Sequence, residues 1–491
     1  MNKARISNIN MPIVLRMIGW LLLIEAAFML VPLVVSLIYA DGSTFPFTYA
    51  IAITTIVGAS LVFGLKPKDD NMGRKEAILL TASIWAVFSL FGTIPFMLSE
   101  LRLSFTDAYF EAMSGFSTTG ASIIRDVEIA PKGILIWRSL TQWVGGMGII
   151  LFTLAVVPML NHKRGIQLFN AEVTGITHDK LRPRISQTAK GLWLVYIVLT
   201  VVLAILLYLG PMNLFDAICQ TLSTVATGGF STRNASYMAW DSRYADTVTM
   251  IVMFICGINF ALLYKTALGD IKPLIKNDTF RLYIAITVIA AVIMIINNMC
   301  NGIYESFSDN LIFSFFEVIS CMTTTGYGAA NFEAWGKLPI TIFFILMFFG
   351  SCAGSTAGGA KMDRLIYLFK NVKNELYRIL HPNAVMPIRI NGKVMPSEAI
   401  TKVMAFLCIY LIILLTLSTV LTALGLPIFD AFFAALSAVS NVGFGAGFTG
   451  VDGSFANIPD LGKWLLAFAM LVGRLEVFTV LVVLSKGFWR K

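Results

Sequence analysis

Long apolar runs separated by short polar segments dominate the chain. Ten of these runs approach the roughly 20 residues that an α-helix needs to cross the hydrocarbon core of a bilayer. They lie near 13–39, 48–64, 77–98, 134–160, 187–209, 247–268, 280–299, 338–380, 399–424 and 461–486. The run at 338–380 is interrupted after Gly350, so it cannot finish crossing as one regular helix. The pattern predicts an all-α polytopic membrane protein.

Composition supports the same class. Of the 491 residues, 57% are hydrophobic and 13% are charged, whereas an average soluble domain has about 25% charged residues. The first run is too long for a removed signal peptide and lacks a small-residue cleavage site, so we expect it to remain as an anchored helix. The six cysteines show no CxxC spacing and predict neither a disulfide framework nor a zinc site.

The distribution of positive charge indicates the orientation. With a cytoplasmic N-terminus, most of the 37 Lys and Arg residues fall on cytoplasmic segments, as the positive-inside rule requires. Both termini are therefore expected in the cytoplasm. The net charge of +9 follows from this asymmetry and needs no nucleic-acid partner. Anionic membrane lipid and a cytosolic protein remain open as partners.

One sequence unit occurs four times between the runs. Its copies are TDAYFEAMSGFSTTGAS from 106, FDAICQTLSTVATGGFS from 215, IFSFFEVISCMTTTGYG from 312 and FDAFFAALSAVSNVGFG from 429. Laid without gaps, they align four glycines, here called the ring glycines: Gly120, Gly229, Gly326 and Gly443. An aspartate stands 13 residues before three of them, at Asp107, Asp216 and Asp430, and Phe313 takes its place in the third copy. The chain therefore contains four internal repeats.

Each copy predicts an apolar helix too short to cross the membrane, followed by a turn rich in Thr and Gly. Non-helical backbone is tolerated at membrane depth only where it is buried in protein or lines water, so we expect the four turns to meet on one axis. The short helices would aim their partly negative C-terminal ends at that axis. Glycine can hold the positive φ that turns a carbonyl oxygen inward, and such oxygens coordinate potassium. This combination predicts a cation site.

Two other sets of residues have simpler explanations. The three aspartates are expected to be N-caps of the short helices rather than ion ligands, because Asp is a favoured N-cap and they lie well before the turns. Gly145, Gly146 and Gly148 in WVGGMGII are expected to serve close helix packing.

The turns resemble a known filter. TTGYG at 324–328 and NVGFG at 441–445 look like the TVGYG filter of potassium channels, and TTGAS at 118–122 and TGGFS at 227–231 are degenerate copies. Together with GSCAGSTAGGAK at 350–361 and GRLEVFTVLVV from 473, they resemble the Trk/Ktr/HKT superfamily of potassium transporters, with the closest match to the bacterial TrkH type. The resemblance covers essentially the whole chain. The copies depart from it at Phe313, and at Ser122 and Ser231, where a second filter glycine is missing.

This resemblance implies site residues. It implies that potassium, as the bound substrate ion, contacts a filter made of Thr118, Thr119, Gly120, Thr227, Gly228, Gly229, Thr324, Thr325, Gly326, Asn441, Val442 and Gly443. It implies that 350–361 is an intramembrane gating loop below the filter, with Gly350, Gly354, Ser355, Thr356, Gly358 and Gly359 as its gating residues. Arg474, near the middle of the last run, would be an electrostatic barrier in the pathway.

Two of these roles have alternatives. A phosphate-binding loop at 350–361 is disfavoured, because GKS and GKT are absent and Lys361 is followed by Met362. Arg474 could instead snorkel to the cytoplasm, although a charge at that depth costs about 2.5 to 3.5 kcal/mol and favours a pore or a partner. Glu476 is a poor partner within the same helix, because it lies only two positions away.

The predicted organisation has five segments. Residues 1–76 hold two accessory transmembrane helices, and four pore repeats occupy 77–160, 187–270, 280–380 and 399–491. Each repeat would consist of a helix, a pore helix with its filter loop, and a second helix, and the four would surround one pore. The second helix of the third repeat is expected to be broken.

The predicted function is potassium uptake across the bacterial inner membrane by a homodimer. The resemblance also implies a cytosolic ring of nucleotide-binding TrkA-type subunits. Basic segments at 161–190 and 361–402 could dock it or could simply be positive-inside loops. A sodium-coupled or sodium-selective secondary cation transporter and a non-transporting scaffold are the alternatives. An enzyme is not expected, because HExxH, GxSxG and dinucleotide motifs are absent. No organic cofactor is expected in this chain.

Overall fold

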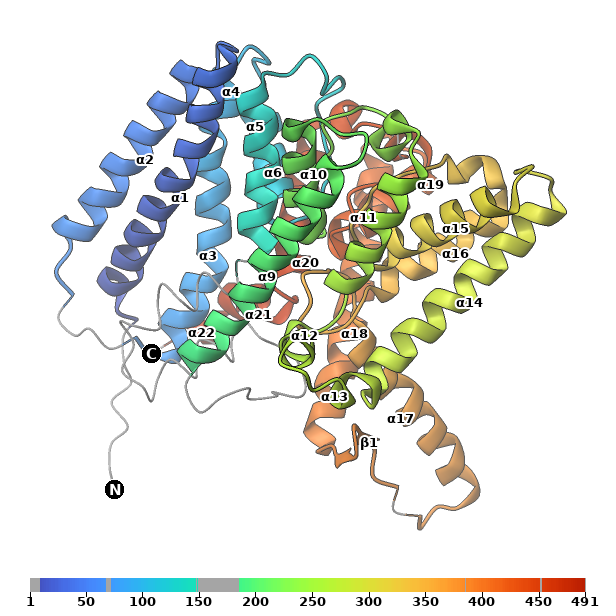
Figure 1. The fold of residues 1–491 in the computed structure, drawn as a ribbon. Helices are drawn as coiled ribbons and strands as arrows, with labels where there is room; N and C mark the ends of the chain where they lie inside the picture. Colours follow the sequence, from blue (N-terminus) through green and yellow to red (C-terminus); the bar gives the residue numbers. More distant parts are fainter. Residues whose placement is uncertain are drawn as a thin grey trace, which may run out of the picture.

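The computed structural model describes residues 9–67, 72–146, 148, 185–384, 386–450 and 453–490. Within them, helices form one bundle in which the chain passes from the N-terminal helices on the left of Figure 1 to the third repeat on the right. The only strands in these ranges are β1 (Arg389–Ile390) and β2 (Lys393–Val394), which pair as a small antiparallel hairpin. The all-α class is confirmed.

Two long helices, α1 (Met11–Tyr39) and α2 (Thr44–Gly64), precede the repeats. They pack closely where Gly19 meets Gly58. A Cβ on Gly19 would lie 2.8 Å from the carbonyl oxygen of Gly58, so small residues allow the two backbones to approach. The α1 helix also packs against α3 and α6 of the first repeat. The expected accessory pair is therefore present.

The elements of the four repeats follow in the same order. The first contains α3 (Arg74–Gly92), α4 (Ile94–Leu98), α5 (Phe105–Phe116) and α6 (Lys132–Gly146). The second contains α9 (Ile185–Tyr208), α10 (Leu214–Val225), η2 (Ser236–Trp240), α11 (Arg243–Cys256) and α12 (Phe260–Ala267), and α13 (Lys272–Ile275) connects it to the third. The third contains α14 (Asp278–Cys300), α15 (Phe307–Met322), η3 (Phe332–Trp335), α16 (Lys337–Phe349) and α17 (Met362–Leu380). The fourth contains α18 (Ser397–Ala423), α19 (Ile428–Ser440), η4 (Gly447–Thr449), η5 (Phe455–Asn457), α20 (Asp460–Arg474), α21 (Phe478–Leu484) and α22 (Lys486–Trp489).

The short helices α5, α10, α15 and α19 are the expected pore helices, and their packing is cyclic. Each packs against the second helix of another repeat: α10 against α6, α15 against α11, α19 against α16, and α5 against α20. The last pair returns from the fourth repeat to the first. The four repeats therefore surround one axis. The exact domain limits stay a prediction.

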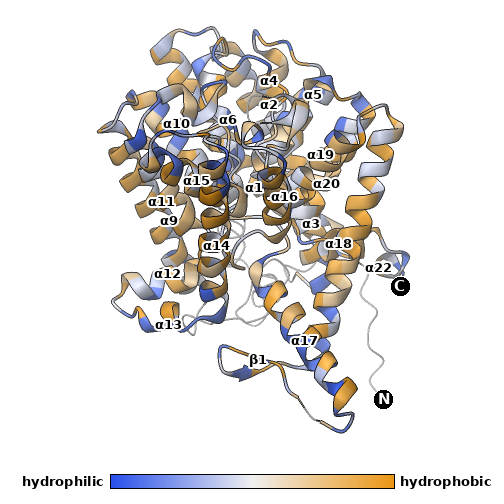
Figure 2. Ribbon diagram, turned by 90° about the vertical axis from the view of Figure 1, so that its right-hand side faces the viewer, coloured by the Kyte–Doolittle hydropathy of each residue, from blue (hydrophilic) through white to orange (hydrophobic). Residues whose placement is uncertain are grey.

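Membrane spans agree with the apolar runs in most places. Among the described residues, six helices are long and apolar enough to cross a membrane, or up to eight if each of two bent pairs counts as one span. Figure 2 shows hydrophobic residues along the middle of α14 and α18 and hydrophilic residues in the loops beyond their ends. The second half of the run at 134–160 lies outside the described residues.

Two runs that we expected to be continuous are broken. The run at 247–268 forms α11 and α12, which are bent by 105°, and the run at 461–486 forms α20 and α21, which are bent by 116°. Asn259 begins α12 as its N-cap and donates from Nδ2 to the Ala353 carbonyl oxygen at 2.7 Å. At the second break, Glu476 and Val477 have φ of 53° and 59°. Each break contains only one strongly polar residue, Asn259 or Glu476, within a run that is otherwise apolar, so average hydropathy did not reveal the breaks.

Candidate ion pathway

The four filter loops have the same backbone conformation. The ring glycines have φ of 85°, 82°, 82° and 100°, and the residues two positions earlier have φ of 55°, 52°, 54° and 55°. Those earlier residues are Thr118, Thr227, Thr324 and Asn441. The positive φ of the glycines was expected. A left-handed threonine is a strained conformation, and such strain concentrates at functional sites.

The four loops abut in a closed ring. A Cβ built on Gly120 would overlap the carbonyl oxygen of Gly228 in the second repeat. In the same way, a Cβ on Gly229 would overlap the carbonyl oxygen of Thr325, and one on Gly326 that of Val442. A Cβ on Gly443 would overlap the carbonyl oxygen of Thr119, which closes the ring. Each overlap is with backbone, which cannot move aside as a flexible side chain can. The structure therefore brings all twelve predicted filter residues together, and only glycine fits at the four ring positions.

Each loop is held to its own pore helix in the same way. The residue before each ring glycine donates its N–H to a carbonyl oxygen near the C-terminus of the helix, at 2.9 Å in three repeats and 3.0 Å in the fourth. The accepting residues are Ser114, Ser223, Ser320 and Ser437. All four are serines six positions before the ring glycine. This repeated serine is a further mark of the unit that the sequence comparison missed.

The aspartates are not N-caps, which corrects the expectation. Ser104 and Asn213 occupy the N-cap positions of α5 and α10 and accept from the backbone N–H groups of Asp107 and Asp216. Asp107, Asp216 and Asp430 lie in the first turns of their helices, where a negative charge is favourable near the partly positive N-terminus. The α15 helix begins one turn earlier in this frame and has Asp309 in its first turn, which accounts for Phe313.

The segment 350–361 lies against the inner side of the ring. Gly358 donates its N–H to Thr324 Oγ1 at 2.7 Å, and Gly359 donates to the Ser440 carbonyl oxygen at 2.9 Å. Thr227 Oγ1 lies 3.2 Å from Thr356 Oγ1. These contacts reach the second, third and fourth repeats.

Glycines allow the segment to turn sharply. Gly350, Gly354 and Gly359 have φ of 67°, 77° and 74°. Ser355 stabilises one turn by donating to the Cys352 carbonyl oxygen at 2.7 Å. All six predicted gating residues of the segment therefore lie together below the filter.

Arg474 is the last residue of α20 and points toward this segment. Its Nη1 donates to the Thr356 carbonyl oxygen and its Nη2 to the Gly145 carbonyl oxygen, both at 2.8 Å. It lines a small cavity of about 20 Å³ together with Trp85 and Gly358. A side chain that donates to two backbone carbonyl oxygens within the bundle does not snorkel to the cytoplasm, so this alternative is wrong.

A cluster of charges anchors the C-terminal end of the segment. Glu476 accepts from Lys361 Nζ at 2.9 Å and also pairs with Arg364. The side chains of all three are at most 12% exposed. The cluster connects the break between α20 and α21 to the start of α17. Glu476 was considered only as a partner for Arg474, so its role in this cluster was missed.

The glycines after Trp143 serve close packing, as expected. A Cβ on Gly145 would overlap the Phe116 carbonyl oxygen, and one on Gly146 would lie 2.9 Å from Ala226 Cα. They bring α6 against the C-terminal ends of two pore helices.

Comparison with known proteins decides the family. The TrkH family model, described as a cation transport protein, matches residues 43–282 and 279–490. The chain belongs to this family. It is 36% identical over 479 residues to the Trk system potassium uptake protein TrkH of Salmonella typhimurium, with 97% of this chain and 99% of that protein covered. The Escherichia coli K12 protein of the same name is 35% identical over the same shares.

A solved structure has the same fold. The crystal structure of the potassium transporter TrkH from Vibrio parahaemolyticus matches with a TM-score of 0.88 and 32% identity, and the match covers 98% of this chain and 100% of that chain. As a member of the TrkH family, the chain is an integral membrane transport protein and not an enzyme.

Several polar residues around the TrkH-family ring were missed from the sequence. Asn441 Nδ2 donates to Thr119 Oγ1 at 2.9 Å and connects the fourth repeat to the first. Gln142 Nε2 donates to the Gly228 carbonyl oxygen at 2.6 Å. Lys463 pairs with Asp107 at 2.5 Å near the outer ends of α20 and α5. Polar side chains at or within apolar runs were the available signal, because burial requires them to have partners.

Proposed function

We propose that this protein takes up potassium ions through the ring formed by its four filter loops. The observation that carries the proposal is the cyclic contact of the ring glycines, in which each loop meets the carbonyl oxygen of the next repeat. Carbonyl oxygens arranged around an axis can replace the hydration shell of potassium. The relatives named above, which are potassium uptake proteins by name, support the same ion.

Potassium is the substrate and the bound ion in this proposal. The twelve filter residues would surround it, with the pore-helix C-termini adding a partly negative field. The repeated threonines also offer hydroxyl oxygens, but some of these are already bonded. Thr324 Oγ1 accepts from Gly358 and Thr119 Oγ1 from Asn441. We therefore assign coordination chiefly to backbone carbonyl oxygens.

The gate in this proposal is the segment 350–361 with Arg474. The segment lies below the ring, and the guanidinium group bonds to its Thr356 carbonyl oxygen at 2.8 Å. Arginine stays protonated in any ordinary environment, so it would repel a cation that passes close to it. Opening would require the segment to leave the ring and Arg474 to lose this contact.

The setting we propose is the bacterial inner membrane, with both termini in the cytoplasm. In Figure 1, α17 and the β1–β2 hairpin project below the bundle, on the side where α1 begins and α22 ends. This part of 361–402 is the proposed docking surface for a TrkA-type regulatory subunit. The other basic segment, 161–190, lies largely outside the described residues.

We also propose a homodimer. The exposed face of α17 carries large apolar side chains at Phe369, Val372, Leu376 and Leu380, whose exposed fractions are 53%, 47%, 62% and 75%. A helix outside the bundle with such a row has apolar area to bury against a second copy. The mass of the purified protein by light scattering tests this state, and a monomer at working concentrations would contradict it.

Flux measurements on the purified protein in liposomes test the transport proposal. We expect potassium and rubidium to enter faster than sodium and lithium, in the absence of a sodium gradient. Flux that requires a sodium gradient would favour a sodium-coupled transporter. Equal potassium and sodium flux would contradict the selective ring, and no flux of any ion would favour a scaffold.

A further inference from the structure

The carbonyl oxygens just outside the ring face protein donors. Two positions after the ring glycine, the Ser122 carbonyl oxygen accepts from the Phe455 N–H at 3.0 Å. The Gly328 carbonyl oxygen accepts from the Tyr237 N–H at 3.0 Å. In the second repeat, the Ser231 carbonyl oxygen accepts from Arg138 Nη1 at 3.1 Å. Ser454 Oγ also donates to the Ser122 carbonyl oxygen, at 3.3 Å. The contact from Arg138 is made by a side chain, so its contribution can be tested by substitution.

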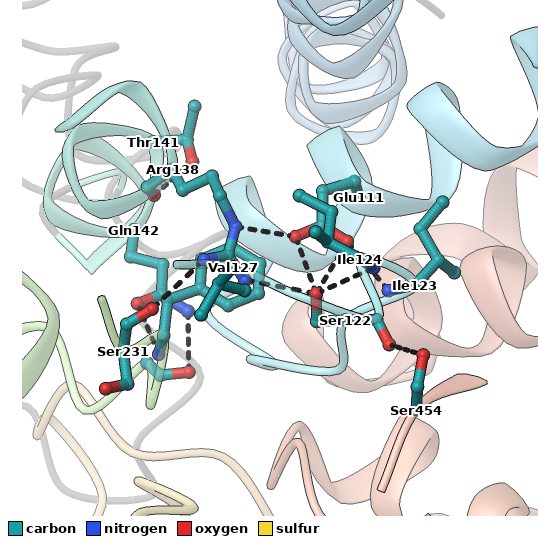
Figure 3. Close-up of polar contacts among 12 residues, drawn as sticks. Glu111, Ser122, Ile123, Ile124, Val127, Arg138, Thr141, Gln142, Ser231 and Ser454 are labelled. Carbon is teal, nitrogen blue, oxygen red and sulfur yellow. Dashed lines mark hydrogen bonds and ion pairs between the residues drawn. The ribbon is translucent and has the colours of Figure 1, made fainter. Parts of the chain in front are cut away.

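Arg138 lies on α6 and connects the loops of the first two repeats. Besides Ser231, it donates from Nη2 to Ser122 Oγ at 3.1 Å and from Nε to Glu111 Oε1 at 2.8 Å (Figure 3). Its guanidinium carbon lies 4.1 Å from the centre of the Phe230 ring. The planar fork of arginine suits three acceptors that lysine could not reach together.

Glu111 on the pore helix α5 completes the connection. Its Oε2 accepts from the Ile123 N–H at 2.9 Å, and its Oε1 accepts from Ser122 Oγ at 3.0 Å (Figure 3). Both members of the ion pair are buried, with Glu111 fully buried and Arg138 2% exposed. A buried pair with this many hydrogen bonds holds its geometry, because breaking it would leave a charge without a partner in a low dielectric.

The third repeat provides an internal comparison. Glu317 occupies the same place as Glu111, nine residues before its ring glycine. It accepts from the N–H groups of Ala329 and Ala330 at 2.7 and 2.9 Å. These contacts hold one loop to its own pore helix. In the first repeat, Arg138 therefore adds a connection, here called the bridge, from this loop to the filter loop of the second repeat.

We propose that Arg138, held by Glu111, is a positioning residue that sets ion selectivity by fastening the filter loops of the first and second repeats together just outside the ring. The inference rests on the proposed potassium function. Both loops contribute ring residues, Gly120 and Gly229, and Arg138 lines the same outer cavity as all four ring glycines. If the bridge is removed, the two loops can shift, and the ring can adapt to the smaller sodium ion. Selectivity then falls while the pathway stays open.

The test uses the double variant Glu111→Gln with Arg138→Met, which removes both charges and keeps side-chain volume. In liposomes we expect the ratio of potassium to sodium flux to fall roughly tenfold, a change of about 1.4 kcal/mol. The apparent KM for potassium should rise while the maximal rate changes little. A purely structural role would lower the amount of folded protein and leave the ratio unchanged.

Arg233→Gln is the matched control. Arg233 lines the same outer cavity and pairs with Asp216 at 3.2 Å, but its side chain is 38% exposed. Its loss removes a charge from the mouth without touching the bridge, so the flux ratio should stay within about twofold of the wild type. If the flux ratio falls equally in this control, the effect comes from the positive charge in the outer cavity and not from the Arg138 contacts, and the proposal is overturned.

If the double variant does not fold, the variant Arg138→Lys tests the proposal instead. Lysine keeps the charge but cannot make the three contacts together, so we expect a smaller fall in the same direction. An unchanged ratio in the folded double variant, or in Arg138→Lys when the double variant fails to fold, would overturn the proposal. A wild-type protein without potassium selectivity would instead contradict the proposed function itself.

Discussion

The ring has the same backbone conformation in all four repeats, whereas the region below it differs from one repeat to another. At the ring, every repeat supplies a left-handed residue, a left-handed glycine two positions later and a serine carbonyl that holds the loop. Below the ring, the repeats diverge. The break in the third repeat spans the twelve residues 350–361, whereas those in the second and fourth span only 257–259 and 475–477.

This difference separates two physical tasks. In the proposed function, surrounding an ion with oxygens would require an equal contribution from every side, and the conformation that recurs four times agrees with this. In the same proposal, closing a narrow path would require only one obstacle, which one long insertion with one positive charge would supply. Substitutions at the ring should therefore change which ion passes, and substitutions below it should change how fast ions pass.

Gly120→Ser should have the largest effect. The added Cβ would overlap the backbone carbonyl oxygen of Gly228, and φ of 85° is unfavourable for serine. We expect the ratio of potassium to sodium flux to fall at least about tenfold, or about 1.4 kcal/mol. Gly64→Ser is the control, because no atom lies within 4 Å of a Cβ built there. An unchanged ratio in folded Gly120→Ser would remove the filter assignment.

Arg474→Ala should come next, with an effect on rate alone. A unit charge about 5 Å from a passing cation costs roughly 3 kcal/mol at an effective dielectric near 20, so we expect uptake to rise about tenfold or more with the flux ratio unchanged. Arg474→Gln should behave alike if charge is the cause. Slow uptake by well-folded Ala and Gln variants would defeat the barrier role. A low amount of folded protein together with slow uptake would indicate that Arg474 has a structural role.

Glu476→Gln should have an intermediate effect. It leaves Lys361 and Arg364 without their shared carboxylate, and unpaired buried charges commonly cost about 3 to 5 kcal/mol. Because segment 350–361, the proposed gate, loses its anchor, we expect a lower melting temperature and a several-fold higher basal flux. Glu375→Gln is the control, since its pair with Arg378 is about half exposed. Basal flux at the wild-type level with lowered stability would assign the cluster to folding alone.

Thr356→Val should have the smallest effect. The change keeps the shape and removes a hydroxyl that lies 3.2 Å from Thr227 Oγ1. The same hydroxyl also lies 3.4 and 3.5 Å from two backbone carbonyl oxygens. These contacts are long, and a neutral hydrogen bond is worth about 0.5 to 1.5 kcal/mol, so flux should rise a few-fold without a change in selectivity. A point substitution is preferable to deleting 357–359, which would also remove the bond from Gly358 to Thr324 in the filter. A changed flux ratio in Thr356→Val would mean that the segment also shapes the ring.

Much of the fold could be predicted from the sequence. Apolar runs predicted the membrane helices, because the length of a span is set by the bilayer itself. The common register of the four units predicted that Gly120, Gly229, Gly326 and Gly443 share a positive φ, which the structure confirms. The glycine-rich segment after Gly350 predicted the long break. These features are local, so each one leaves a pattern within a few neighbouring residues.

The remaining features depended on tertiary structure. The bends at 257–259 and 475–477 lie within apolar runs, and a hydropathy pattern cannot distinguish a bent span from a straight one. Asn259 bonds to Ala353, and Arg138 bonds to Ser231. In both pairs the partners are more than 90 residues apart. A single sequence shows that a polar residue in an apolar run needs a partner, but only the packing of repeats around a common axis decides which distant group it meets.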